Sequence, residues 1–137
     1  AARPDIAIGA DLIAGFPTED EAMFANTLAL IDDCDIVHAH IFPYSPRDNT
    51  PAARMPQVAP GVARTRAGVL RERAGARRAA WLASLAGTRQ AILVERPGDR
   101  GHAGNFAEVL LPPQEVGTIA NVKIERVQDG KLIGVAA

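Results

Sequence analysis

The first 42 residues alternate between strand-like and helix-like patterns, and this restricts the fold more than any other feature of the chain. Residues 5 to 14 are apolar and rich in small side chains, as in a strand covered on both faces, and residues 36 to 42 form a second apolar run. Between them, Met23, Thr27, Leu30 and Ile31 recur at helical spacing, which predicts a helix over about residues 19 to 33. A strand, a helix and a strand this close together form a βαβ unit, which requires parallel strands and a right-handed crossover.

The predicted first helix has a recognisable start. Gly15, Phe16 and Pro17 end the first strand. Thr18 is predicted to be the N-cap, and Glu21 follows three residues later as in a capping box. This places Gly15 at the turn from a strand into a helix.

Such a unit does not close a core by itself. A parallel sheet normally has helices on both faces and several more strands. We therefore expect residues 1 to 86 to be the C-terminal portion of a larger α/β domain whose other strands lie upstream.

A proline-rich loop follows the second strand, over residues 42 to 53. Prolines fix the backbone and remove hydrogen-bond donors, so this segment is predicted to be a stiff extended loop at a strand end, where sites are commonly built. Tyr44, Ser45 and Arg47 emerge there. They would either contact a nucleoside-type ligand by stacking, hydrogen bonds and charge, or anchor the loop.

A long helix is predicted from Pro60 to about Leu85. Its candidate buried positions are Val62, Val69, Leu70, Trp81, Leu82 and Leu85. Its outer face is predicted to be arginine, and that face would be either solvated or bound to a polyanion. The residues concerned are Arg64, Arg66, Arg71, Arg73, Arg77 and Arg78.

After Gly87 the pattern changes to short alternating runs separated by turn residues. Strands are predicted over residues 90 to 95, 105 to 111, 117 to 127 and 131 to 135. Four or five short strands in so short a segment indicate a small all-β barrel. We therefore expect a domain boundary near residue 87, with the barrel over residues 87 to 137.

Charge is segregated along the chain although the net charge is only −1. Residues 1 to 50 carry two arginines and nine acidic residues, a net charge of −7, whereas residues 51 to 102 carry ten arginines and three acidic residues, a net charge of +7. The middle of the chain is therefore the part expected to meet a polyanion. No apolar run approaches the length of a bilayer span, so a cytoplasmic protein without membrane contact is expected.

Metal binding has little support in the sequence. The single cysteine, Cys34, has acidic neighbours and is predicted to be a structural thiol at a helix end. His38 and His40 share one face of a predicted strand without further ligands nearby, which favours structural histidines. No metal site and no catalytic residue are assigned to this chain.

Asp11 and Gly15 are candidates for a ligand site at the strand ends. Asp11 lies within an apolar strand, where an unpaired carboxylate is costly, and a structural hydrogen-bonding role is equally compatible with its position. Gly15 would let a ligand approach the backbone closely, or would only permit a tight turn.

The predicted barrel continues the basic character of the helix through Arg89, Arg96, Arg100 and His102. Small barrels bind RNA through loops and basic side chains. Phe106 is the only aromatic residue in this part of the chain. Recognition by shape and charge is therefore expected rather than base reading.

Three segments resemble the radical S-adenosylmethionine methylthiotransferases. They are Gly15-Phe16-Pro17-Thr18-Glu19, Phe42-Pro43-Tyr44-Ser45-Pro46-Arg47 and Thr50-Pro51-Ala52-Ala53-Arg54-Met55-Pro56. Residues 10 to 19 and 53 to 58 are most similar to the threonylcarbamoyladenosine tRNA methylthiotransferases. Asn49 stands where that family usually has glycine, and asparagine also tolerates left-handed backbone.

The resemblance implies the C-terminal part of a radical S-adenosylmethionine partial TIM barrel, followed by an RNA-binding TRAM barrel. It implies methylthiolation at C2 of N6-threonylcarbamoyladenosine beside the tRNA anticodon, with S-adenosylmethionine and two 4Fe-4S clusters. The cluster cysteines would lie in the missing N-terminal part, so this chain alone would run no radical chemistry. The cofactor side would be lined by Asp11, Gly15, Phe16, Pro17, Phe42, Tyr44, Ser45 and Arg47. The tRNA would contact Arg89, Arg96, Arg100, His102 and Lys123.

Two alternatives remain open. One is a non-catalytic RNA-binding fragment. The other is a relative that acts on isopentenyladenosine in tRNA or on a ribosomal protein.

Overall fold

The computed structural model describes residue 3 and residues 5 to 136. These residues form two compact units. One is Ile8–Arg78, and the other contains the chain from Ala79 onward. The change of unit falls within helix α2 (Pro60–Ser84), and the boundary expected near residue 87 stays a prediction.

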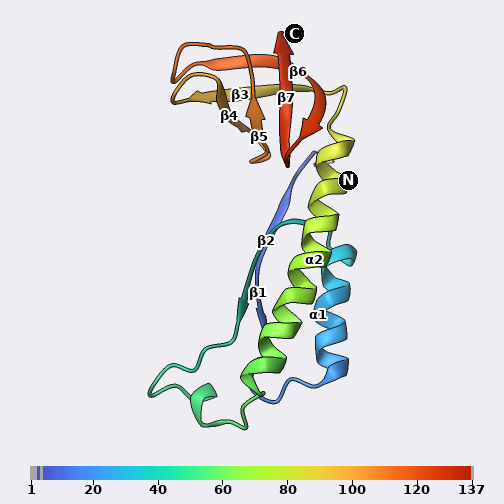
Figure 1. The fold of residues 1–137 in the computed structure, drawn as a ribbon, viewed down its shortest axis with the longest axis vertical. Coiled ribbons are helices and arrows are strands. Elements are labelled where there is room, and N and C mark those ends of the chain that lie inside the picture. Colours follow the sequence, from blue (N-terminus) through green and yellow to red (C-terminus); the bar gives the residue numbers. More distant parts are fainter. Residues whose placement is uncertain (1–2, 4, 137) are drawn as a thin grey trace. The chain divides into compact units, whose positions relative to one another are not determined.

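The first unit is built on two parallel strands, as predicted. Strand β1 (Ile8–Ala14) and strand β2 (Ile36–Pro43) pair in parallel, and helix α1 (Glu21–Asp33) connects them. Figure 1 shows α1 and α2 beside each other along the strands. A short 3-10 helix, η1 (Ala52–Arg54), lies in the loop that precedes α2.

One face of the strand pair packs against both helices. The buried cluster combines apolar residues of β1, β2, α1 and α2, namely Leu12, Ala14, Ile31, Ile41, Ala67, Leu70 and Ala74. Most of the residues that α2 contributes are alanines, which allow its backbone to come close to the strands. The candidate buried residues Leu70, Trp81 and Leu82 are confirmed, but Val62 and Val69 are about 40% exposed and were wrong.

Helix α1 begins two residues later than predicted. Its N-cap is Asp20, whose carboxylate accepts a hydrogen bond from the Met23 amide at 2.8 Å. Thr18, predicted as the cap, instead has a φ of 70° and belongs to the turn. Aspartate and threonine are both good caps, so the sequence alone did not select the right one.

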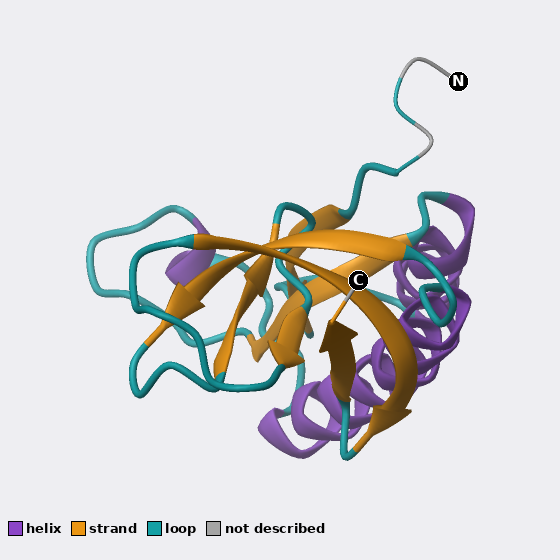
Figure 2. Ribbon diagram, turned by 90° about the horizontal axis from the view of Figure 1, so that it is seen from above, coloured by secondary structure: helices purple, strands orange, loops and turns teal. Residues whose placement is uncertain are grey.

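The second unit is the predicted small β-barrel. Its five strands are β3 (Arg89–Glu95), β4 (Arg100–Ala103), β5 (Glu108–Leu110), β6 (Ile119–Gln128) and β7 (Lys131–Ala136). They close in the order β3-β4-β5-β7-β6, with β5 and β7 parallel and the other pairs antiparallel. Figure 2 shows the long, curved β6 that helps to close it. Ile92, Val94, Val109, Ile124 and Leu132 fill the interior.

Strand β4 has no counterpart among the predicted strands. Its four residues, Arg-Gly-His-Ala, include no β-branched or large apolar side chain. The strand forms because β3 and β5 pair with it on either side, which a local pattern does not reveal. Among the described residues, no helix is long and apolar enough to cross a bilayer.

Candidate functional site

The carboxyl ends of β1 and β2 lie side by side because the strands are parallel and in register. Ile13 pairs with Phe42 and Ala14 with Pro43. The Tyr44 amide then donates a hydrogen bond to the Ala14 carbonyl at 2.8 Å. The loop after β2 is therefore attached to the end of β1 at its first residue.

Aromatic side chains form a rim at these strand ends. Phe16 and Tyr44 meet edge to face, with ring centroids 5.3 Å apart and planes at 74°. Phe16 is 43% exposed and Phe42 is 52% exposed. The Tyr44 hydroxyl is buried and has no hydrogen-bond partner among the described residues. We call Phe16, Phe42 and Tyr44 the aromatic rim.

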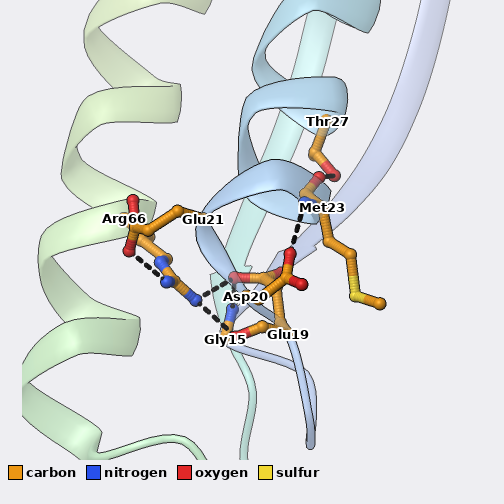
Figure 3. A network of polar contacts seen from close by, with 7 residues as sticks. All are labelled: Gly15, Glu19, Asp20, Glu21, Met23, Thr27 and Arg66. Atoms are coloured by element: carbon orange, nitrogen blue, oxygen red, sulfur yellow. Dashed lines mark hydrogen bonds and ion pairs between the residues drawn. The ribbon is translucent and has the colours of Figure 1, made fainter.

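A buried ion pair and its hydrogen bonds hold the turn that follows β1 (Figure 3). Glu19 Oε1 accepts hydrogen bonds from the Gly15 amide at 3.0 Å and from Arg66 Nη1 at 2.8 Å. The same Arg66 nitrogen also donates to the Glu19 carbonyl at 3.0 Å. A single arginine of α2 therefore fixes both the side chain and the backbone of the turn.

Further contacts hold the Arg66 guanidinium in place. Arg66 Nη2 donates to Glu21, and the guanidinium carbon lies 5.4 Å from the centre of the Phe24 ring. The hydrogen bond with Glu21 is the main reason why the pKa of Arg66 is raised above its ordinary value; burial lowers the pKa and Glu19 raises it. Arg66 is a permanent cation here, and its role is structural.

Gly15 is required by packing against α2. Its φ is 73°, and a Cβ atom there would lie 2.3 Å from the Cβ of Ala63. Of the two interpretations of Gly15, the geometry gives direct support to the tight turn, because α2 occupies the space beside it. Pro17 is also fully buried. Gly15 and Pro17 therefore flank the exposed Phe16 with two buried positions.

The proline-rich loop is ordered by its own hydrogen bonds. Thr50 donates to the Arg47 carbonyl through both its amide at 3.3 Å and its hydroxyl at 2.7 Å. The Thr18 amide donates to the Pro56 carbonyl at 3.1 Å, which joins the far end of the loop to the turn after β1. Asn49 adopts a φ of 65°, the left-handed backbone anticipated for it. These hydrogen bonds define the path of the loop, and its stiffness stays a prediction.

The other predicted cofactor residues lie in two places. Asp11 is exposed on β1, where its register partner is the exposed His40, so the expected buried carboxylate was wrong. Ser45 and Arg47 are exposed on the loop beyond the aromatic rim. The structure brings Phe16 and Tyr44 into contact at the strand ends, and Phe42 is exposed near the end of β2. The assignment of any of these residues to a cofactor stays a prediction.

Most arginines of α2 make specific contacts within the fold. Arg64, Arg71 and Arg73 are exposed, as predicted for an outer face, and Arg66 is the one that departs from the prediction. Arg66 is buried, Arg71 donates to the Ile41 carbonyl at 2.9 Å, and Arg73 pairs with Asp32 at 3.0 Å. Arg77 pairs with Asp35, and Arg78 contacts the His38 ring. One feature of the sequence indicates that Arg66 is buried. Arg66 directly precedes Ala67, which with Ala74 belongs to the small residues of α2 that pack on the strands.

The predicted RNA-binding residues lie on the barrel. Arg89 and Lys123 are register partners on β3 and β6, both are exposed, and neither pairs with a described acidic residue. Arg96 is likewise exposed. Arg100 pairs with Asp99 at 3.1 Å, and His102 Nδ1 lies 3.0 Å from a Glu95 oxygen.

The described residues contain no group of three or more histidine, cysteine, aspartate or glutamate side chains able to hold a metal ion. Cys34 is exposed at the C-cap of α1, where the sequence placed it. An iron-sulfur cluster therefore does not fit the described part of this chain.

Curated relatives were found, although no protein-family model matches. A threonylcarbamoyladenosine tRNA methylthiotransferase of Rickettsia prowazekii is 37% identical over 131 residues, which cover 95% of this chain and 31% of the relative. A tRNA-2-methylthio-N(6)-dimethylallyladenosine synthase of Maricaulis maris is 37% identical, over 98% of this chain and 31% of its own length. Its counterpart in Coxiella burnetii is 43% identical, over 73% of this chain and 23% of its own length.

The chain therefore spans about a third or less of the length of these relatives. Over most of its own length it is homologous to the tRNA methylthiotransferases, and it corresponds to their C-terminal part.

Proposed function

We propose that this chain is the C-terminal part of an enzyme that adds a methylthio group to C2 of N6-threonylcarbamoyladenosine next to the tRNA anticodon. The observation that carries the proposal is the 37% identity over 95% of the chain to a relative named for that modified nucleoside. In this proposal, residues 1 to 86 belong to the catalytic domain, and residues 87 to 137 form a TRAM-like domain that binds tRNA in the cytoplasm.

The aromatic rim fits one side of an S-adenosylmethionine site. Exposed rings of Phe16 and Phe42 offer apolar faces for a nucleoside, and the Tyr44 ring, packed edge to face on Phe16, supports the first of them. Asp11, Ser45 and Arg47 would supply charge and further hydrogen bonds around them, and Gly15 and Pro17 would fix the turn that carries Phe16. S-adenosylmethionine would supply both the radical and the methyl group.

The residues of this chain would bind and orient the cofactor. The tight strand-helix turn and the stiff loop give the rim a fixed geometry, so little conformational freedom is lost on binding. The cysteines for two 4Fe-4S clusters would come from the rest of the protein, since Cys34 is the only cysteine here.

A second substrate has specific support. The relatives from Coxiella and Maricaulis are named for dimethylallyladenosine, and their identity to this chain is as high. Methylthiolation of isopentenyladenosine in tRNA is therefore the second candidate. A ribosomal-protein substrate and a non-catalytic RNA-binding fragment have no comparable support.

The test uses the whole protein that contains this chain, expressed in a bacterial strain without its own tRNA methylthiotransferases. Nucleosides of its tRNA are analysed by mass spectrometry. We expect methylthio-threonylcarbamoyladenosine, and at least a tenfold reduction when the rim is changed by Phe16→Ala. Methylthio-isopentenyladenosine instead would establish the second candidate, and tRNA binding without either product would support the non-catalytic one.

A further inference from the structure

An apolar groove lies on the outer face of the barrel, where β3 runs between β4 and β6. It has a volume of about 490 Å³ and is lined by Ala91, Leu93, Glu95, His102, Ala103, Gly104, Phe106 and Ile119. Leu93 is 46% exposed, Ile119 63% and Phe106 74%. Register explains the grouping, because Leu93 lies directly between Ile119 and His102.

Phe106 is held at this groove in an unfavourable backbone conformation. Its φ is 62°, which is rare for an aromatic residue. Its amide donates to the Ala103 carbonyl at 2.9 Å, and the Ala103 amide donates to the Ala107 carbonyl at 3.0 Å, so the turn fixes this geometry. A strained turn that exposes an aromatic ring to solvent points to a ligand for that ring.

Charge on the same face indicates what kind of ligand it is. Arg89 and Lys123 lie directly opposite each other, two residues along β3 and β6 from Ala91 and Asn121. Both are exposed, and neither is paired with a described acidic residue. Like charges in this arrangement repel each other, and a bound anion would remove the repulsion.

The groove therefore offers an apolar strip and an aromatic ring, and the cationic pair lies beyond its lining, next along β3 and β6. Arg89 and Leu93 are four residues apart, about 13 Å along the strand at the usual rise. The one carboxylate in the lining, Glu95, is engaged by His102 Nδ1 at 3.0 and 3.2 Å. An apolar protein partner would leave the two cations facing each other, whereas a nucleotide uses both features.

We propose that this groove binds an unpaired nucleotide of RNA, with its base on Phe106 and Leu93 and a neighbouring phosphate between Arg89 and Lys123. The inference rests on the proposed function, since it names how the barrel would hold tRNA. It also departs from the expectation of shape and charge recognition alone, because a base stacked on an exposed ring is recognised as a single strand.

The test measures binding of the 137-residue chain to a single-stranded adenosine hexaribonucleotide and to a 12-base-pair RNA duplex, by fluorescence anisotropy at several salt concentrations. Phe106→Ala is expected to weaken hexamer binding about tenfold and duplex binding less than twofold. Val116→Ala removes an exposed side chain outside the groove lining and is the matched control, expected to leave both unchanged.

A second arm examines the phosphate. Lys123→Ala should reduce the salt slope for the hexamer by about 0.7, the value for one single-strand phosphate contact. Arg126→Ala removes an equal charge that is already paired with Glu125, and should leave the slope unchanged. Equal hexamer affinity in wild type and Phe106→Ala would refute the proposal, as would concentration-dependent dimerisation that Phe106→Ala abolishes.

The two proposals fail differently. If hexamer affinity does not depend on Phe106 but the whole protein still methylthiolates tRNA, the groove proposal is refuted and the enzyme assignment stands. If hexamer binding depends on Phe106 but no methylthiolation of tRNA is found, the enzyme assignment is refuted and the groove proposal stands.

Discussion

At the scale of single residues, Glu19 and Arg66 decide the shape of the turn after β1. The Glu19 side chain is 8% exposed and accepts from both the Gly15 amide and Arg66. Removing either partner is expected to destabilise the fold strongly, because the other charge stays buried without its counter-charge. The turn that positions Phe16 therefore depends on a residue of α2 that is 47 positions away in sequence.

Replacing Arg66 should destabilise the first unit. We expect Arg66→Met to lower the free energy of unfolding by about 3 kcal/mol, because Glu19 stays buried without its counter-charge. Urea denaturation followed by far-ultraviolet circular dichroism measures this. Arg64→Met, at an exposed position on the same helix, should change it by less than about 0.5 kcal/mol. Adding Glu19→Gln to Arg66→Met should restore part of the loss, and strictly additive effects would contradict the pairing.

At the scale of elements, local sequence signals located the helices and most strands but not the faces they bury. Pro60 does begin α2, and the parallel pair follows from the strand-helix-strand order. Val62 and Val69 were expected to be buried because they are large and apolar. The strands instead contact alanines, whose small size lets the helix approach closely enough to meet Gly15.

For the candidate site, too, the sequence predicted the position but not the contacts that hold it. The strand-end position of the aromatic rim follows from parallel topology, which the sequence implied. The Arg66 network did not follow, because it joins segments far apart in the chain. Strand β4 and the groove beside it depend on neighbouring strands and were missed for the same reason. Phe106 was noted as the only aromatic residue of the barrel, but its exposure came from the backbone of one turn.

A strand-to-strand ion pair makes the barrel sensitive to acid. Lys131 on β7 donates to Glu108 on β5 at 2.7 Å, and this hydrogen bond lowers the pKa of Glu108 below its ordinary value. The stabilisation is therefore present above the ordinary carboxyl pKa of about 4.3 and is lost as pH falls through the lowered value. The free energy of unfolding can be measured by Trp81 fluorescence during urea denaturation, repeated between about pH 6 and pH 3. It should fall less steeply with decreasing pH in Glu108→Gln than in the wild type. Glu115→Gln, an exposed control, should keep the wild-type profile.

At the scale of the whole molecule, part of the charge segregation along the sequence is neutralised in the fold. Acidic residues of the first 50 positions pair with arginines of α2, through Glu19 and Glu21 with Arg66, Asp32 with Arg73, and Asp35 with Arg77. Three of the ten arginines in the +7 segment are thereby neutralised. Among the residues predicted to bind RNA, Arg89, Arg96 and Lys123 are the ones not already paired with a described acidic residue.

This distribution predicts which cations contribute to tRNA affinity. Binding of the chain to tRNA, measured by filter binding from about 50 to 200 mM salt, should lose about 1.5 from the slope of log K against log salt in the double variant Arg89→Ala/Lys123→Ala. The double variant Arg73→Ala/Arg77→Ala also removes two positive charges, but both are neutralised within the fold, so its slope should match that of the wild type. An equal reduction in both variants would mean that α2 contacts the phosphates as well. The barrel would then no longer account for the electrostatic part of tRNA binding.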